Sequence, residues 1–338
     1  AAANMEPQLL PLLTKEGVLI KVSVRFWRGC KKLKAEDIGL KSSDVSDRLI
    51  SLGHKRLLPR ESTQQLALLE GRAHALIEGN TFPFLNGLAH FLPNARLQEV
   101  TQRLNEIETE FWQAKDEFLR RYTSLRLSAS TEWQSLAQKL VDDPDRLLAT
   151  IEASFPLPQQ MNRFYGFETQ LFQVSVPESL GVELITTAEQ QQVISARQQA
   201  ARDAGAKIRQ DVQTFVADCV ASLREQTAVL CQEMLISIGT SETGVHQKTL
   251  NRLVRFIDQF KQMNFANDVE MERQLERVRR ELLSKTAEEY RDSSTARSRL
   301  TAGLQQLASH ARQLAKQDAT ELVDRFGELG RRKFQLAA

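Results

Sequence analysis

The strongest cluster of residues that could do chemistry is the stretch VRFWRGCKKLK, which begins at Val24. It places basic residues around two aromatic rings with no acidic residue between them: Arg25, Phe26, Trp27, Arg28, Lys31, Lys32 and Lys34. Basic side chains interleaved with rings can hold phosphates while the rings stack on bases. Two interpretations stay open. The stretch contacts nucleic acid with Trp27 as the stacking ring, or it is a basic turn that is solvated or docks a protein.

The other polar residues form no pattern typical of a catalytic or metal site. Five histidines are scattered, and the closest carboxylate spacing, Glu70 and His74, is that of an ordinary pair on a helix surface. The sequence contains no phosphate-binding glycine-rich loop, no dinucleotide-binding fingerprint and no nucleophile elbow. We therefore expect no enzymatic activity, no cofactor and no metal.

The three cysteines, Cys30, Cys219 and Cys231, form no CxxC pair. Cys219 and Cys231 fall in one expected helix, where they are separated by about 18 Å along the axis. This distance excludes a disulfide between them, because bridged Cα atoms lie within about 7 Å of each other. The cysteine pattern therefore indicates a reducing compartment.

Charge and hydropathy limit the classes of partner. The 45 Lys and Arg residues nearly balance the 43 Asp and Glu residues, so a charged surface must be local. No apolar run approaches the roughly 20 residues that span a bilayer, and the first residues lack the basic start of a secretory signal. We expect a soluble, cytoplasmic protein that does not bind membranes.

The N-terminal half predicts helices with a small amount of strand. Residues Val18 to Trp27 alternate between apolar and polar side chains, as a half-buried strand does, and Phe167 to Val176 repeats this pattern. Helical patterns occupy residues 43–53, 61–78, 94–122, 130–141 and 144–154. This half is therefore expected to fold as helices around a small sheet.

An apolar segment, GNTFPFLNGLAHFLP from Gly79 to Pro93, interrupts these helices. Asn86 and Gly87 at its centre both tolerate positive φ angles, so they predict a two-residue hairpin turn between the strands FPFL and LAHFL. The apolar side chains are expected to fill the core: Phe82, Phe84, Leu85, Leu88, Phe91 and Leu92. We interpret the segment as structural, in preference to a ligand-binding role.

The C-terminal half has few helix breakers and predicts three helices, from Thr187 to Ile238, Gln247 to Met263, and Asp268 to about Gly327. The last helix carries a heptad-like seam: Leu300, Leu304, Leu307 and Leu314. This seam is thin for a monomer, because the region is rich in Gln, Ala, Arg and Glu. An antiparallel helical hairpin that also presents surface to another chain explains the pattern.

Together these patterns predict a mainly α protein. A small N-terminal β-sheet or hairpin packs on helices, and long helices follow as an antiparallel helical or coiled-coil arm. We expect two domains, an α+β domain at residues 1–180 and a long-helix domain at residues 181–338.

A set of short motifs runs through the N-terminal half in a fixed order. They are the strand VLIKVSVRFW, Lys31 to Leu33, Glu36 to Leu40, SLGHKRLLP from Ser51 to Pro59, and Gly79 followed by FLNGLA from Phe84 to Ala89. A proline then precedes a long helix. In this order the motifs resemble the uncharacterised bacterial family called domain of unknown function 3150, mainly over residues 17 to about 135. One departure is His90-Phe91-Leu92 before Pro93, where the family usually has Ala-Val-Pro.

The resemblance implies a system of partners. Members of that family occur on phages, plasmids and integrative elements as well as chromosomes, often beside genes for a MoxR-type AAA ATPase and a von Willebrand A protein that resembles cobalt-chelatase subunits. No enzymatic activity is established for the family. The resemblance therefore implies a third component that works with both of these proteins.

Three functional hypotheses follow. The first is a non-enzymatic adaptor or scaffold whose helical arm engages the ATPase and the von Willebrand A protein. The second is a nucleic-acid-binding protein of a mobile element, acting through the basic stretch around Trp27. The third is a self-assembling coiled-coil structural protein, in which residues 187–326 pair with copies of themselves. The pathway, whether defence, DNA processing or assembly, is left open.

Overall fold

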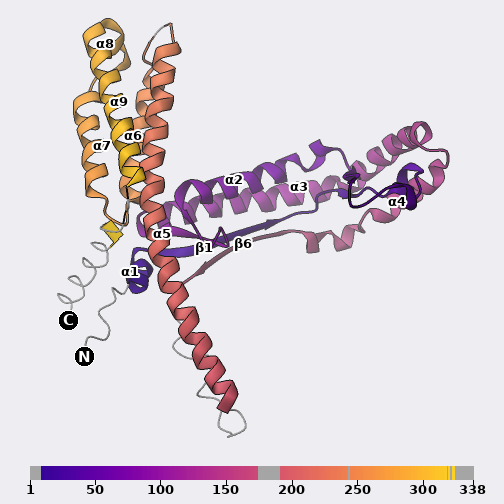
Figure 1. The fold of residues 1–338 in the computed structure, drawn as a ribbon. Coiled ribbons are helices and arrows are strands. Elements are labelled where there is room, and N and C mark those ends of the chain that lie inside the picture. Colours follow the sequence, from indigo (N-terminus) through magenta and orange to yellow (C-terminus); the bar gives the residue numbers. More distant parts are fainter. Residues whose placement is uncertain (1–8, 174–190, 243, 318, 320–321, 324–338) are drawn as a thin grey trace. The chain divides into compact units, whose positions relative to one another are not determined.

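The computed structural model describes residues 9–173, 191–242, 244–317, 319 and 322–323 (Figure 1). This part of the chain is mainly helical and contains a small antiparallel sheet, as predicted. The chain divides into two compact units. Unit 1 contains residues 1–20, 80–98 and 171–338, and unit 2 contains residues 21–79 and 99–170. The predicted domain boundary at residue 180 lies outside the described residues.

The main sheet has the strand order β4-β5-β1-β6. Strand β1 (Gly17–Arg25) confirms the first predicted strand and pairs antiparallel with β5 (Ala89–Pro93), which in turn pairs antiparallel with β4 (Phe82–Phe84). Strand β6 (Gly166–Phe172) confirms the second predicted strand as far as it is described. The predicted end of that strand at Val176 lies outside the described residues.

Strands β4 and β5 form the predicted hairpin, but the two-residue turn was wrong. Four residues, 85–88, connect the strands, and Leu85, Asn86 and Gly87 have left-handed φ angles of 47°, 57° and 82°. Leu85 and Leu88 are exposed, although they were predicted to lie in the core. The wider turn carries them beyond the paired strands. A left-handed leucine is unfavourable, so the pairing of the flanking strands must hold this turn.

The strands of the hairpin do contribute to the core of unit 1, as predicted. Phe84 and Phe91 contact the ring of Phe215, with centroids 4.9 and 5.6 Å apart. Phe82 and Phe91 also contact Phe265, at 5.6 and 4.9 Å. These edge-on and tilted ring pairs join the hairpin to the helical part of the same unit.

The turn gives the first prediction. Replacing Asn86 by Pro should destabilise the protein by at least about 1 kcal/mol, because Pro fixes φ near −65° and cannot reach the left-handed region. The matched control, Asn86→Gly, should leave stability nearly unchanged, since glycine reaches this φ freely. Urea unfolding followed by circular dichroism measures both. Equal stability of the two variants would contradict the turn geometry.

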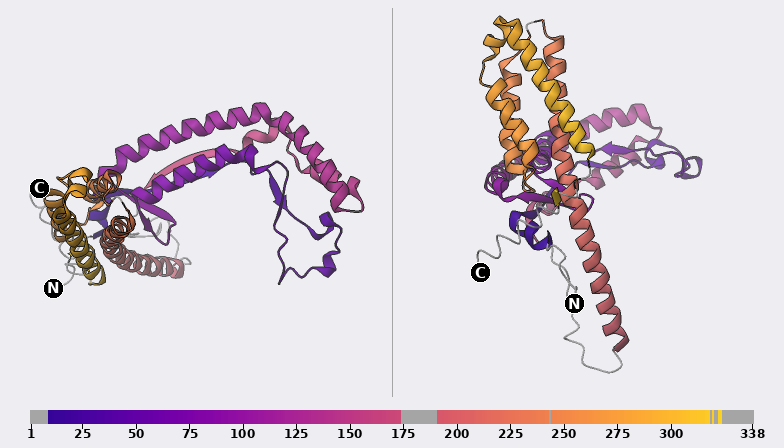
Figure 2. Two further views of the ribbon diagram at one scale, coloured as in Figure 1. Left: turned by 90° about the horizontal axis from the view of Figure 1, so that it is seen from above. Right: turned by 60° about the vertical axis from the view of Figure 1, so that its left-hand side comes forward.

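Three helices of unit 2 surround its aromatic core. Helix α2 (Gln64–Asn80) confirms the helix predicted at 61–78, and α3 (Asn94–Leu140) merges two predicted helices into one. Helix α3 is long and gently curved (Figure 2). Helix α4 (Pro144–Ser154) returns alongside α3, where Arg126 contacts Glu152 at 2.7 Å.

The region between β1 and α2 differs most from the prediction. The helix predicted at residues 43–53 was wrong: only a short 3₁₀ helix, Ser42–Asp44, forms there, followed by turns. Two strands that were not predicted, β2 (Cys30–Lys32) and β3 (His54–Arg56), pair antiparallel on either side of this region. Three residues are too few for an alternating pattern to be recognised.

The helices of unit 1 are α1 (Leu9–Glu16), α5 (Gln191–Thr240), α6 (Gln247–Met263), α7 (Val269–Leu282), α8 (Ala287–Asp292) and α9 (Ser294–Lys316). The bounds of α6 are those predicted. A single helix from Asp268 to Gly327 was wrong, because the chain breaks after α7 and again at Ser293, and residues 324–327 lie outside the described part. Although α5 is long, no helix of the described ranges is long and apolar enough to cross a membrane.

The heptad-like seam of α9 packs inside this chain. Leu300, Leu304, Leu307 and Leu314 are all buried, and α9 runs beside α5 and α7 (Figure 1). The leucine seam was expected to present surface to another chain. In the structure it packs instead against the antiparallel helix α5 of the same chain. These four leucines are not exposed for pairing with a second copy, so the hypothesis of self-assembly through them lacks structural support.

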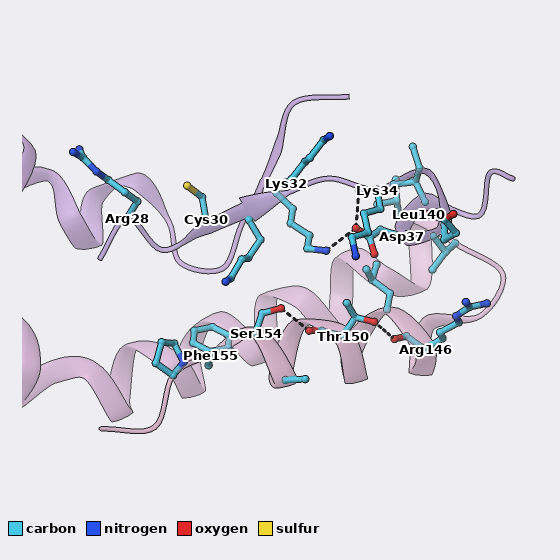
Figure 3. Close-up of a pocket in the computed structure, with 18 of the residues that line it drawn as sticks. Arg28, Cys30, Lys32, Lys34, Asp37, Leu140, Arg146, Thr150, Ser154 and Phe155 are labelled. Carbon is cyan, nitrogen blue, oxygen red and sulfur yellow. Dashed lines mark hydrogen bonds and ion pairs between the residues drawn. The ribbon is translucent and has the colours of Figure 1, made fainter. Parts of the chain in front are cut away.

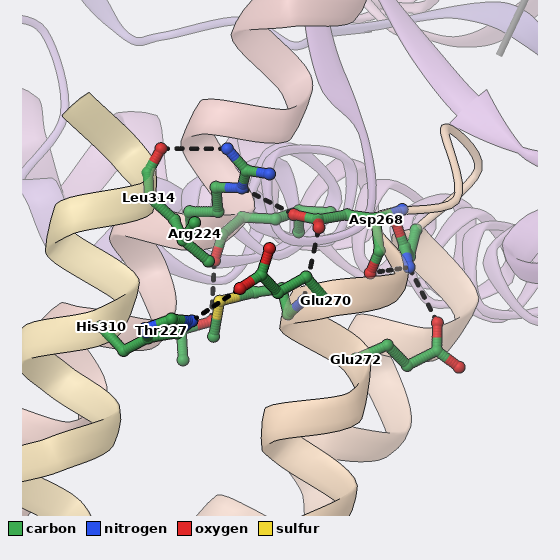
Figure 4. A network of polar contacts seen from close by, with 10 residues as sticks. Arg224, Thr227, Asp268, Glu270, Glu272, His310 and Leu314 are labelled. Atoms are coloured by element: carbon green, nitrogen blue, oxygen red, sulfur yellow. Dashed lines mark hydrogen bonds and ion pairs between the residues drawn. The ribbon is translucent and has the colours of Figure 1, made fainter. Parts of the chain in front are cut away.

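A buried ion pair joins three helices of unit 1 (Figure 4). The Arg224 guanidinium of α5 donates to the Asp268 carboxylate at 2.7 Å and to the carbonyl oxygen of Leu314 in α9 at 2.9 Å. Asp268 also caps α7 by accepting from the Met271 amide. Each charged atom group thus has several partners, which a buried charge requires.

Replacing Asp268 by Asn should destabilise the protein by about 3–5 kcal/mol, because Arg224 then stays buried without a counter-charge. Asn can still cap the helix, so the loss of stability reports on the missing negative charge alone. The control is Glu233→Gln, which removes an exposed ion pair with Arg252 and should cost at most about 1 kcal/mol. Denaturant titration measures both; similar losses would contradict a special role for the buried pair.

Candidate functional site

Unit 2 contains a large open cleft, which we call the basic cleft. Its volume is about 1320 Å³. One wall comes from β2 and the turn that follows it, and the other from the end of α3 and from α4 (Figure 3). Seven basic residues line it: Arg28, Lys31, Lys32, Lys34, Lys55, Arg146 and Arg163. The predicted basic stretch thus lies in a cavity rather than on a flat surface.

The β2–β3 ribbon places the lysines of the first wall. Lys31 lies directly opposite Lys55 in the antiparallel ladder, so their side chains leave the same face of the ribbon. Lys32, the next residue, points to the opposite face. The ladder therefore distributes the positive charges on both sides of a narrow ribbon.

A buried ion pair explains how two lysines can face each other there. The Lys55 ammonium contacts the Asp37 carboxylate at 2.6 Å, with only 5% and 8% of the two side chains exposed. The Lys34 amide donates to the same carboxylate at 2.9 Å. Burial tends to raise the pKa of Asp37, but the hydrogen bonds from Lys55 and Lys34 outweigh it, and this pKa lies below its ordinary value of 3.8.

Helix α4 builds the opposite wall. Asp143 caps the helix by accepting from the Arg146 amide, and Pro144 occupies the first turn, where its missing N–H is not needed. The hydroxyls of Thr150 and Ser154 bond back to carbonyls one turn earlier, so they are occupied within the helix (Figure 3). The guanidinium of Arg146 is the first cation along this wall.

Five of these cations form no ion pair. The side chains of Lys31, Lys32, Lys34, Arg146 and Arg163 have no carboxylate within ion-pair distance in the described part of the chain, and all five residues are exposed. Three carboxylates that form no ion pair also line the cleft: those of Glu36, Asp142 and Asp143. The cleft therefore carries mixed charge with a positive excess, which suits a ligand that is acidic but not uniformly anionic.

Only some residues of the predicted contact line the basic cleft. Arg28, Lys31, Lys32 and Lys34 line the basic cleft, whereas Arg25 lies outside it, 3.8 Å from Glu168 on β6. Arg28 lines the cleft but is engaged already, since it donates to Glu70 at 3.0 Å and lies over the ring of Phe26.

Trp27 is buried and cannot act as a stacking ring for a base in this structure. Its indole contacts the rings of Phe118, Tyr122 and Phe155 at centroid distances of 6.2, 5.7 and 6.1 Å. Tyr122 in turn donates its hydroxyl to the Pro156 carbonyl at 2.6 Å. Trp27 thus anchors the basic stretch in the aromatic core of unit 2 and leaves the lysines exposed beyond it.

Sequence reasoning missed Lys55, Arg146 and Arg163. Lys55 lies within the SLGHKRLLP motif, but nothing local marks it as the partner of Asp37. The helix at residues 144–154 was predicted. Its residue Arg146, however, lies more than a hundred positions after Lys31 and Lys32, and no local pattern links them. Within the described residues, no group of three or more histidine, cysteine or acidic side chains could hold a metal ion.

These features define a mainly helical protein with a small antiparallel sheet and a cleft lined with cations. The sequence model of one family, described as a protein of unknown function (DUF3150), matches residues 14–289. The chain belongs to the DUF3150 family. This match extends well past residue 135, where the recognised motifs end, and it includes α5, α6 and α7. Comparisons with curated proteins and with solved structures found no match.

The ion pair in the cleft predicts a pH dependence. Because the folded pKa of Asp37 is lowered, its contribution to stability is complete above the ordinary pKa of 3.8 and is lost as the pH falls through the folded pKa. The control is a double variant, Asp37→Leu with Lys55→Met, which removes both charges. Below pH about 4, the free energy of unfolding of the parent should fall relative to that of the double variant. A difference that does not change with pH would contradict this.

Proposed function

We propose that this protein is a non-enzymatic adaptor or scaffold subunit that acts with a MoxR-type AAA ATPase and a von Willebrand A protein. In this proposal the ATPase hydrolyses ATP, and the present chain supplies docking surfaces. Membership of the DUF3150 family supports it, since the resemblance implies neighbouring genes for both partners. By the same resemblance, we propose that the protein is encoded on a mobile element or phage and acts in the cytoplasm, with defence as one candidate pathway.

The observation that carries the proposal is the composition of the basic cleft and its rim. Unpaired cations line it, and two leucines at its edge are exposed to solvent. Leu140, at the end of α3, is 49% exposed and lines the cleft; Leu40, which follows the lining residue Gly39, is 45% exposed. We take the exposed leucines and the unpaired cations beside them as the apolar and polar contacts of a protein-binding surface.

Co-purification tests the proposal. The tagged chain is co-expressed with the ATPase and the von Willebrand A protein encoded beside it, and the eluate is analysed by mass spectrometry before and after nuclease treatment. We expect both partners to elute in constant ratio and to survive the nuclease. Elution of neither partner would overturn the proposal, and so would partners that are lost when nucleic acid is digested.

A pair of variants tests where the partner docks. Leu40→Ser with Leu140→Ser should reduce recovery of the partner at least about tenfold, since it removes apolar contact at the rim. The matched control, Val229→Ser with Ile236→Ser, removes two exposed apolar side chains of α5 and should retain full recovery. All four side chains are exposed, so both variants should fold. A loss of binding in the control alone would place the docking surface on α5 instead.

A further inference from the structure

We propose that β2 is the docking edge for an extended, acidic peptide segment, which adds to the β2–β3 ribbon as a third strand inside the basic cleft. This inference rests on the proposed function, because it takes the partner to be a protein. It goes further by naming the backbone groups and cations that receive the segment, and the chemistry of the segment itself.

The first argument is the pattern of hydrogen bonds in the ribbon. The Leu57 amide donates to Gly29 O at 2.7 Å, and the Leu33 amide donates to Gly53 O at 3.0 Å. In the observed register, these bonds flank the pairs Cys30↔Arg56 and Lys32↔His54, which are therefore the pairs without mutual hydrogen bonds. The amide and carbonyl groups of Cys30 and Lys32 consequently point away from β3, along the outer edge of β2.

These outward groups have no partner within the described part of the chain. Cys30 and Lys32 each offer one N–H and one C=O, spaced two residues apart, which is the spacing that an added strand pairs with. An unpaired edge of this kind is the usual template for strand addition.

The second argument is the position of this edge. Cys30, Lys31 and Lys32 all line the basic cleft, although alternate residues of a strand point to opposite faces. The cleft must therefore border the edge of β2 rather than one face of the ribbon. Figure 3 shows the strand running along the cleft above α4, with Cys30 and Lys32 in sequence along it.

The other edge of the ribbon is partly covered. The indole N–H of Trp133 on α3 donates to the outward carbonyl of Arg56 at 3.1 Å. Of the β3 residues only Lys55 lines the cleft, and its ammonium is paired with Asp37; Arg56 and His54 do not line it. Strand addition is thus directed to β2, where the cleft leaves room for it.

The third argument is charge and size. Lys31 and Lys32 lie on opposite faces of β2, with Lys34 beyond them and Arg146 on the facing wall, so acidic side chains on either face of an added strand meet a cation. The volume of about 1320 Å³ exceeds the range of about 300–1,000 Å³ that is usual for small-molecule pockets. A short extended peptide fits these dimensions.

A nucleic acid fits this cleft less well. Single-stranded nucleic acids are held by rings that stack on bases. Of the four rings that line the cleft, Phe26, Trp27 and Phe155 are buried, and the partly exposed ring of Phe164 is covered by the Arg163 guanidinium, 4.7 Å from its centroid. The carboxylates of Glu36, Asp142 and Asp143 would repel a continuous phosphate backbone. A peptide, in contrast, offers amides and carbonyls to β2 and places its acids only where the cations are.

Fluorescence anisotropy tests the inference on the full chain. The probe is a fluorescein-labelled peptide of about eight residues that alternates Glu and Val, and the control probe alternates Lys and Val. We expect saturable binding of the Glu probe that weakens with added salt, and no binding of the Lys probe. A labelled oligo(dT) is the third probe, and its binding in place of the Glu peptide would overturn the proposal in favour of nucleic acid.

Charge variants locate the site. Lys31→Glu with Lys32→Glu should weaken binding of the Glu probe at least about tenfold. The matched control, Lys248→Glu with Lys285→Glu, changes the same number of exposed lysines in unit 1 and should stay within about twofold. Equal weakening in both variants would mean that only net charge matters, and it would overturn the proposal.

A second pair of variants isolates the backbone. Lys32→Ala and Lys32→Pro remove the same charge, but only proline also removes the outward amide, and the ladder to β3 does not use that amide. We expect Lys32→Pro to bind the Glu probe about fivefold more weakly than Lys32→Ala. Equal affinities, with both variants folded by circular dichroism, would exclude strand addition.

The outcomes separate this inference from the proposed function. Partners that co-purify with a chain that binds no acidic peptide would overturn strand addition and leave the adaptor role standing. A chain that binds the Glu probe at β2 but recovers neither partner would support strand addition and remove the named partners.

Discussion

The bundle of unit 1 depends on one buried ion pair, between Arg224 and Asp268. Arginine brings a charge into the interior from the middle of α5, and the chain supplies two oxygen partners, from the start of α7 and the end of α9. Because an unmatched buried charge is costly, these three points cannot move independently. Because Arg224 also donates to the Leu314 carbonyl, a shift of the leucine seam of α9 along α5 would break this hydrogen bond.

Unit 2 uses the same device for a different purpose. Asp37 is likewise buried, and it accepts from one lysine side chain and one backbone amide. Here the pair neutralises Lys55 beneath the ribbon, while its cross-strand neighbour Lys31 stays exposed and unpaired. The burial of Trp27 in the aromatic core fixes the start of this ribbon. The buried Lys55 and the buried ring of Trp27 thus together fix the position of the exposed Lys31.

Sequence patterns predicted the long elements because period and capping are local signals. The strand at Gly17–Arg25, the helix Gln247–Met263 and the cap at Asp268 could all be recognised from neighbouring residues. The basic cleft could not, because its walls meet only after α3 has returned through α4. The ribbon strands are too short to show a pattern, and the exposure of Leu85 follows from a turn held by the strands around it. Distance along the chain, rather than ambiguous composition, limited the prediction.

The interleaving of the two units has a consequence for synthesis on the ribosome. All of unit 2 lies before residue 171, so it is complete before the long helices of unit 1 are translated. The first segments of unit 1 emerge early as well, but Phe215 and Phe265, which contact Phe82, Phe84 and Phe91, are made more than a hundred residues later. The aromatic hairpin therefore stays uncovered until residues up to Phe265 have been made. Exposed apolar surface of this kind favours aggregation, so we expect the nascent chain to need a chaperone at this stage.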